Sequence, residues 1–225
     1  MTRFVIFDID GTLVDSVDLH ARAWQEAFRH FGKEVPVDDL RQQIGKGGDQ
    51  LLPVFFTREE LDRFGKELEQ YRGDLFMREY LPRVHAFPRV RDLFERVKAD
   101  KKRIALASSA KKEELEALKK IANVEGLADA ETCSDDIDRS KPHADVFHAV
   151  LEALGGPAPA EGIAVGDTPY DAEAAGKAGL GTVGIVGGAF SAEELRAAGC
   201  VAVYREPADL LRHYDRSPLA DSTLA

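Results

Sequence analysis

The sequence predicts an α/β protein with a Rossmann-like parallel sheet core, helices on both faces of the sheet, and an inserted, wholly helical subdomain. Two patterns predict this fold. Short apolar segments of strand length alternate with segments of helical periodicity along most of the chain, whereas one block near the N-terminus contains helical periodicity alone. Continuous apolar strands are typical of a parallel sheet covered on both faces, and the alternation supplies the crossover helices that parallel strands need.

Six segments are expected to form the strands of the core. The stronger four are apolar, and each is followed by small or acidic residues and then by a helical stretch. They cover residues 4–7, 103–107, 162–165 and 182–186, and two weaker segments cover residues 130–133 and 200–204. The Gly- and Pro-rich residues 155–159 are expected to form a surface loop. The polar tail after Tyr214 is expected to be frayed.

The segment from Ser16 to about Arg83 contains no convincing strand. Its first apolar residues recur at helical spacing behind Asp15 and Ser16, which are residue types suited to a helix N-cap. Further helices are expected at about residues 37–43, 50–56 and 58–80. We therefore expect two units, which are a core of residues 1–15 and 87–225 and a helical subdomain of residues 16–86.

The composition indicates a soluble protein with no nucleic-acid or membrane partner. Among 225 residues, 30 Lys and Arg stand against 40 Asp and Glu, so the net charge of −10 argues against a general basic face. No stretch approaches the ~18 consecutive apolar residues that a membrane span needs, and the N-terminus lacks the pattern of a secretory signal. Cys133 and Cys200 form no disulfide framework and no metal-ligand spacing, which indicates reduced thiols in a cytoplasmic protein.

The strongest chemical pattern is a pair of carboxylates, Asp8 and Asp10, directly after the first expected strand and before Gly11 and Thr12. In an open α/β sheet the ligand crevice lies at the carboxyl ends of the strands, so both acids are expected to face it. Two carboxylates this close are costly unless a cation neutralises them or one is protonated. Mg²⁺ fits, because it binds a few carboxylates together with substrate phosphate and water. A hairpin turn at this point is the alternative, but a helix follows instead of a second strand.

This opening resembles the first motif of the haloacid dehalogenase superfamily, Asp-x-Asp-x-Thr, and the resemblance extends from Asp8 to Asp171. It implies that Asp8 is a nucleophile that becomes an aspartyl-phosphate and that Asp10 is the general acid and base. It also places Thr12 on the turn beside the substrate. The dehalogenating branch of the family lacks the second acid, so the presence of Asp10 argues against carbon–halogen cleavage.

Three further motifs follow in the order typical of the family. The resemblance implies that Ser108 binds the transferring phosphoryl group and that Lys141 neutralises charge between nucleophile and phosphate. Taken alone, a serine after a strand is more often a helix cap, and a lysine before proline is more often a solvated helix start. The metal ligands implied for Mg²⁺ are Asp8, Asp10, Asp167 and Asp171.

The helical insertion resembles the C1-type cap of the branch that contains phosphoglycolate phosphatase and beta-phosphoglucomutase. The substrate contacts expected from this resemblance are Thr12, His20, Lys46, Ser109 and Lys111. From the residues alone, His20 is equally well explained as a helix-surface histidine, and Lys111 belongs to a charged helix face. The loop of residues 44–49 has no arginine for a second phosphate, and Lys46 lacks the bidentate fork of an arginine.

These patterns lead to one functional hypothesis and two alternatives. We expect a Mg²⁺-dependent phosphatase that hydrolyses a small phosphorylated metabolite, a phosphomonoester, through an aspartyl-phosphate. One alternative is a sugar-phosphate mutase similar to beta-phosphoglucomutase, which the missing arginine disfavours. The other is a small-molecule or protein-binding module with a degenerate site, which the intact set of Asp8, Asp10, Lys141 and Asp167 disfavours. The protein is expected to act in the cytoplasm as a monomer or weak homodimer.

Overall fold

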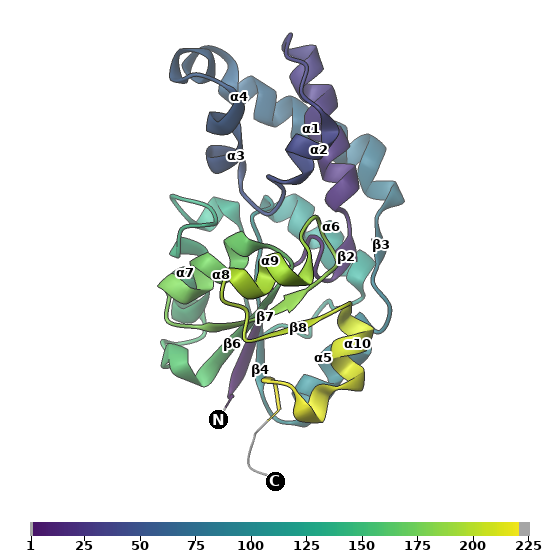
Figure 1. The fold of residues 1–225 in the computed structure, drawn as a ribbon, viewed down its shortest axis with the longest axis vertical. Coiled ribbons are helices and arrows are strands. Elements are labelled where there is room, and N and C mark those ends of the chain that lie inside the picture. Colours follow the sequence, from purple (N-terminus) through teal and green to yellow (C-terminus); the bar gives the residue numbers. More distant parts are fainter. Residues whose placement is uncertain (1, 221–225) are drawn as a thin grey trace.

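Six parallel strands form the central sheet of the protein, in the order β5–β4–β1–β6–β7–β8 (Figure 1). The structure is a computed structural model that describes residues 2–220. The strands are β1 (Phe4–Phe7), β4 (Arg103–Ala107), β5 (Ala130–Thr132), β6 (Gly162–Gly166), β7 (Gly181–Ile185) and β8 (Ala202–Tyr204). They coincide with the six predicted segments to within two residues at each end, and the predicted α/β fold is confirmed.

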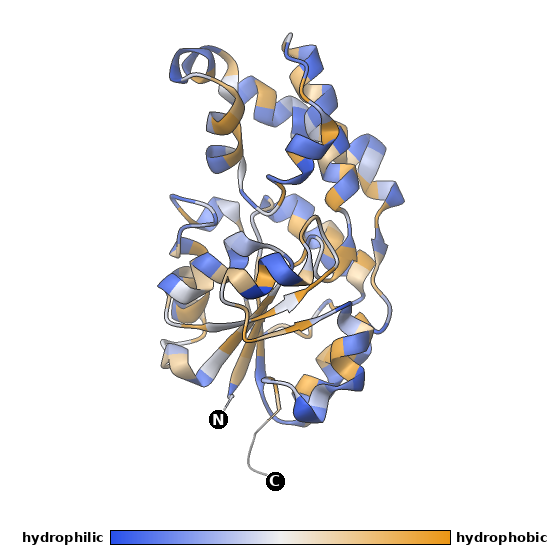
Figure 2. Cartoon of the chain, viewed as in Figure 1, coloured by the Kyte–Doolittle hydropathy of each residue, from blue (hydrophilic) through white to orange (hydrophobic). Residues whose placement is uncertain are grey.

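Helices cover both faces of this sheet, because successive strand residues point to opposite sides. Val5 and Phe7 pack with α5 (Val90–Ala99), α6 (Lys112–Ala122) and α10 (Pro207–Arg212). Phe4 and Ile6 pack on the other side with α7 (Asp145–Ala153) and α8 (Pro169–Lys177). The short helix α9 (Ala192–Ala197) packs against the far end of the sheet. Figure 2 shows the result as apolar strands between helices that are striped apolar and polar.

The register of the sheet brings the ends of three strands together. Strand β1 lies between β4 and β6, and Phe7 is paired with Leu106 on one side and Val165 on the other. The residues that follow each strand therefore emerge side by side at one edge of the sheet. Asp8, Ser108 and Asp167 all lie at this edge because each comes within two residues of these paired positions.

The helical subdomain stands over this edge of the sheet and has an apolar core of its own (Figure 1). Its core includes Trp24, Phe28, Leu40, Leu52 and Leu68. The helices are α1 (Val17–His30), α2 (Val37–Arg41), α3 (Gly48–Phe55) and α4 (Arg58–Leu75), followed by a π-helical turn at Phe76–Tyr80 and a 3₁₀ turn at Leu81–Arg83. The single helix predicted at 58–80 is thus an α-helix that ends at Leu75 and continues as a π-helical turn.

Two short antiparallel strands, β2 (Val14–Asp15) and β3 (His85–Ala86), carry the chain into and out of the helical subdomain. Val14 pairs with Ala86 and Asp15 pairs with His85. We propose that this ribbon is the junction between the core, residues 1–15 and 87–225, and the helical subdomain, residues 16–86.

The C-terminal tail differs from the prediction. A 3₁₀ turn covers Tyr214–Arg216, and Tyr214, Ser217 and Leu219 are buried, so the expected fraying is wrong for residues 214–220. The physical reason is that Leu219 completes the apolar cluster beneath α5 and α10, while Thr2 Oγ1 donates a 2.9 Å hydrogen bond to the Pro218 carbonyl. Residues 221–225 of the expected frayed tail lie outside the described residues. None of the helices within residues 2–220 has both the length and the apolar character needed to cross a membrane.

Candidate active site

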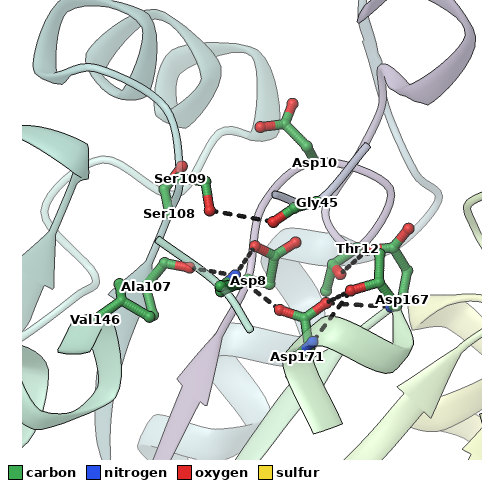
Figure 3. Close-up of polar contacts among 12 residues, drawn as sticks. Asp8, Asp10, Thr12, Gly45, Ala107, Ser108, Ser109, Val146, Asp167 and Asp171 are labelled. Carbon is green, nitrogen blue, oxygen red and sulfur yellow. Dashed lines mark hydrogen bonds and ion pairs between the residues drawn. The ribbon is translucent and has the colours of Figure 1, made fainter. Parts of the chain in front are cut away.

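Three carboxylates meet at the carboxyl edge of the sheet, with oxygens within 4.8 Å of one another (Figure 3). Asp8 follows β1, Asp167 follows β6, and Asp171 lies in the first turn of α8. Thr12 Oγ1 donates a 3.3 Å hydrogen bond to Asp167 Oδ1, whereas the buried Asp167 Oδ2 has no hydrogen-bond partner among the described residues. Asp171 instead completes a capping box with Thr168, whose hydroxyl donates to Asp171 Oδ2 at 2.6 Å.

A fully buried lysine neutralises part of this charge. The Lys141 ammonium lies 2.5 Å from Asp8 Oδ1 and 2.7 Å from Asp171 Oδ1, and it donates a 3.0 Å hydrogen bond to the Ala107 carbonyl. Burial by itself lowers the pKa of Lys141, but the attraction of Asp171 and Asp8 is larger in sum, and the pKa is raised. One ammonium therefore faces three carboxylates.

Burial and the excess of negative charge in this cluster raise the pKa values of Asp8 and Asp167. Burial raises the pKa of Asp8 to about 7 in spite of the attraction of Lys141, and Asp171 and Asp10 raise it further. Burial, followed by repulsion from Asp8 and Asp171, raises the pKa of Asp167 well above its ordinary value. A cation between these acids would reverse both shifts.

The residues fit a hard divalent cation such as Mg²⁺. Carboxylate oxygens are its preferred protein ligands, and the unpartnered Asp167 Oδ2 is a buried oxygen with no other partner among residues 2–220. Asp8 and Asp167 would hold the ion directly. Asp171 would position the site, because its two oxygens already contact Lys141 and Thr168.

The Asp10 carboxylate does not join this cluster, and the expectation that Asp10 ligates the metal stays a prediction. Its carboxylate points away from Asp8, Asp167 and Asp171 (Figure 3). It accepts a hydrogen bond from Ser16 Oγ at 2.6 Å and lies 2.8 Å from His20 Nε2. Ser16 uses its hydroxyl in this contact instead of capping α1. Burial alone would raise the pKa of Asp10, but the contacts with His20 and Ser16 outweigh burial and lower it.

His20 belongs to a buried network that joins the helical subdomain to the core. The residue is 3% exposed, so it is not a surface histidine, and its ring stacks on Phe76 at 3.9 Å between centroids. Its Nδ1 contacts the guanidinium of Arg72, which forms a 3.1 Å ion pair with Glu114 of α6. The chain from Asp10 through His20 and Arg72 to Glu114 thus crosses between the two parts of the protein.

Sequence reasoning missed Arg72 and Glu114, although a pattern in α4 marks the arginine. The buried residues of this helix include Gly65, Leu68 and Leu75. Arg72 falls between Leu68 and Leu75 at helical spacing, so an arginine occupies the buried face. A charged residue at such a position is costly unless it is paired, which makes it a candidate for a functional contact.

A cavity of about 310 Å³ lies between the core and the helical subdomain. Asp8 and Asp10 line it on the core side, and Trp24 and the loop of residues 44–49 line it on the other. Its volume falls at the lower end of the range of small-molecule sites.

The other predicted site residues near this cavity differ in their exposure and in their hydrogen-bond partners. Ser109 and Lys111 line the cavity, with Ser109 Oγ donating to the Gly45 carbonyl at 3.2 Å and Lys111 exposed. Lys46 also lines it, but its ammonium donates to Gln43 Oε1 at 2.7 Å and lies 4.6 Å above the ring of Tyr170. Ser108 is buried at the end of β4, and its hydroxyl accepts a 3.0 Å hydrogen bond from the Ala110 amide, as a turn-capping serine does.

Residues 42–49, which include the loop that lines the cavity, contact the core at several points that sequence reasoning did not identify. The Tyr170 hydroxyl donates to the Gln42 carbonyl at 2.7 Å, and the Ser140 amide donates to Asp49 Oδ2 at 3.0 Å. Gly45 has φ of +105°, and a Cβ there would lie 2.7 Å from Thr168 Cγ2, so glycine is required on both counts. The loop therefore rests against residues that adjoin Lys141 and Asp171.

The fold and the site together define an enzyme with a doubly wound α/β core, a buried carboxylate–lysine centre and a helical insertion over it. The chain belongs to the haloacid dehalogenase-like hydrolases, whose family model matches residues 5–185. This match confirms the resemblance inferred from the four motifs.

Individual relatives cover nearly the whole chain. A protein of Thermotoga maritima named phosphorylated carbohydrates phosphatase is 28% identical over 92% of this chain and 95% of its own length. Phosphoglycolate phosphatase of Aquifex aeolicus is 30% identical over 80% of this chain and 83% of its own length. The crystal structure of a hydrolase from Pseudomonas syringae superposes with a TM-score of 0.85 at 28% identity, covering 98% of this chain and 100% of that one.

Proposed function

We propose that the protein is a Mg²⁺-dependent phosphatase that hydrolyses a small phosphomonoester through an aspartyl-phosphate on Asp8. The observation that carries the proposal is the pairing of Asp8, which lines the cavity, with the fully buried Lys141 at 2.5 Å. Relatives named as phosphatases of phosphorylated carbohydrates and of phosphoglycolate support the reaction class. Cytoplasmic location and a monomeric or weakly dimeric state stay predictions from the sequence.

In the proposed reaction Asp8 attacks phosphorus and Asp10 gives a proton to the departing alcohol oxygen. Asp10 then removes a proton from the water that attacks the aspartyl-phosphate, which releases phosphate and restores Asp8. The ammonium of Lys141 neutralises negative charge on Asp8 and would do the same for the phosphoryl oxygens. Thr12 and Ser108 lie at the same edge of the sheet. The bound metal would supply positive charge to the transferring phosphoryl group.

The protonation of Asp10 fits this double role. In the resting protein the contacts with His20 and Ser16 lower the pKa of Asp10, so the carboxylate is ionised, as the second step requires. A phosphate dianion placed beside it raises the pKa of a carboxyl group. Substrate binding therefore favours the protonated form of Asp10, which the first step requires.

The mutase alternative is less well supported. A mutase must hold a second phosphate in the helical subdomain, which calls for a strong cationic fork. Lys46, the one cation of the loop at residues 44–49, is engaged by Gln43 and Tyr170, and Arg72 is paired with Glu114. Given a hexose 1-phosphate and its bisphosphate activator, the protein should release phosphate faster than it forms the 6-phosphate isomer in a coupled assay.

The direct test is hydrolysis of an aryl phosphate by Asp8→Asn protein in the presence of Mg²⁺. We expect activity to fall to below about 1% of wild type, because an amide oxygen cannot serve as the phosphoryl acceptor. Circular dichroism checks that the variant is folded, and Asp62→Asn, at a side chain 76% exposed on α4, is the matched control. Folded Asp8→Asn protein with more than a few per cent of wild-type activity would overturn the assignment.

A further inference from the structure

We propose that the leaving-group end of the cavity selects uncharged, hydroxyl-rich alcohols over alcohols that carry a second anionic group, and that Glu69 sets this preference. The inference rests on the proposed phosphatase function, which it deepens by naming the class of substrate. It follows from the charged side chains that line the cavity on the side of the helical subdomain and around it.

The cations near the leaving-group end are mostly engaged elsewhere. Arg72 is 14% exposed and is held by its 3.1 Å ion pair with Glu114 and its contact with His20. The Lys46 ammonium is held by Gln43 and by the ring of Tyr170. Lys111 is the remaining cation among the described lining residues, and its side chain is exposed at the rim.

Glu69 presents an unengaged carboxylate to the same space. It lies on α4, lines the cavity and is half-buried. Burial raises its pKa, with Asp49 adding to the rise and Lys111 and Arg72 opposing it through space, and no hydrogen bond contributes. Its negative charge therefore lacks a direct partner among the residues that the structure describes.

The neighbouring backbone is shaped around this carboxylate. Gly48 begins α3, and a Cβ at this position would lie 2.1 Å from Glu69 Oε1. Any other residue would push the carboxylate away, so glycine makes the room for it. Asp49, Asp135 and Asp138 also line the cavity, so the acids among its lining residues outnumber the cations Lys46, Arg72 and Lys111.

A carboxylate in this place distinguishes two kinds of leaving group. Hydroxyl groups donate hydrogen bonds to Glu69 and relieve the cost of its partial burial. A carboxylate or second phosphate on the leaving group would meet repulsion from Glu69 with only Lys111 to offset it. Sugar and polyol monophosphates therefore fit this end of the cavity, whereas phosphorylated hydroxy acids and bisphosphates do not.

The test compares sorbitol 6-phosphate with 6-phosphogluconate, two linear six-carbon esters that differ at the far end, where one has a hydroxyl and the other a carboxylate. We expect wild-type kcat/KM to be about tenfold higher for sorbitol 6-phosphate, mainly through KM, as for a contact to the remote end of a substrate. Glu69→Gln keeps the shape and removes the charge, so it should lower this ratio to about one by improving 6-phosphogluconate. Glu67→Gln, exposed on the same helix, should keep the wild-type ratio.

Each outcome decides a separate point. A wild-type preference for 6-phosphogluconate, or a ratio that Glu69→Gln and Glu67→Gln leave equal, would overturn the role of Glu69 while the phosphatase function stands. Hydrolysis of an aryl phosphate, measured in parallel, tests the proposed phosphatase function independently of the preference for one leaving group. If wild-type protein hydrolyses neither the aryl phosphate nor either sugar ester, both proposals fall.

Discussion

Replacing Lys141 by Met removes the only cation in direct contact with the buried carboxylates of the described site. The side chain is 0% exposed, and its ammonium lies 2.5 Å from Asp8 and 2.7 Å from Asp171. Methionine has a similar length and no charge. In the variant, Asp8, Asp167 and Asp171 would remain buried within 4.8 Å of one another with no ammonium between them.

The expected loss of stability follows from that burial. Breaking a buried ion pair by removing one partner costs about 3–5 kcal/mol, because the other charge stays desolvated. With a urea m-value of about 3 kcal/mol/M for a chain of this size, the unfolding midpoint should fall by about 1–1.7 M. Phosphatase activity should be lost as well, since the charge beside the nucleophile is gone.

Urea unfolding followed by circular dichroism at pH 8 in EDTA measures this effect without a metal contribution. The matched control is Lys177→Met, whose ammonium pairs with Glu173 at 2.8 Å on the surface at 47% exposure. An exposed pair of this kind contributes less than about 1 kcal/mol. A free energy of unfolding for Lys141→Met within 1 kcal/mol of the control would refute the view that this lysine holds the carboxylates together.

Two further predictions concern the metal and the thiols. EDTA should abolish phosphatase activity, and Mg²⁺ should restore it better than Ca²⁺, whose looser coordination suits the site less well. Mg²⁺ at 100 times its Kd should also raise the free energy of unfolding by about 2.7 kcal/mol. Full activity in EDTA would contradict the metal site. Burial raises the pKa of Cys133 and of Cys200 to about 11, with Asp136 and Asp171 respectively adding to the effect. Because the thiolate is the reactive form, native protein should react with a disulfide reagent at pH 8 about 100-fold more slowly than unfolded protein, with the rate rising up to about pH 11. Rapid reaction of the folded protein at pH 8 would disprove this.

The strands and the group of carboxylates could be predicted because each depends on a pattern of residues that are neighbours in the sequence. Two of the carboxylates follow directly on apolar strands, as Asp8 follows Phe4–Phe7 and Asp167 follows the strand that ends at Gly166. Parallel pairing then brings these positions together without further information. The order of the motifs therefore predicted that these carboxylates lie near one another, and the oxygens of Asp8, Asp167 and Asp171 lie within 4.8 Å of one another.

The contacts of the helical subdomain could not be predicted in the same way. Helix α4 carries charges along most of its length, and which of them face the cavity depends on how the helix lies over the core. Glu69 and Arg72 face it, and Glu67 is exposed. The orientation of Asp10 likewise depends on Ser16 and His20, since a side chain two residues from Asp8 can point to either part of the protein. The buried tail escaped prediction because Leu219 is one of few apolar residues in a mostly polar segment.

The chain leaves the core and returns to it at neighbouring points, since Val14 pairs with Ala86 and Asp15 with His85. A two-residue turn from Asp15 to His85 would convert this ribbon into an ordinary hairpin and leave β1 and the path into α5 in place. Insertion of a segment between two neighbouring positions is well tolerated by folded domains. If the proposed function holds, the segment that selects the alcohol could therefore be exchanged while the residues that break the phosphate ester are kept.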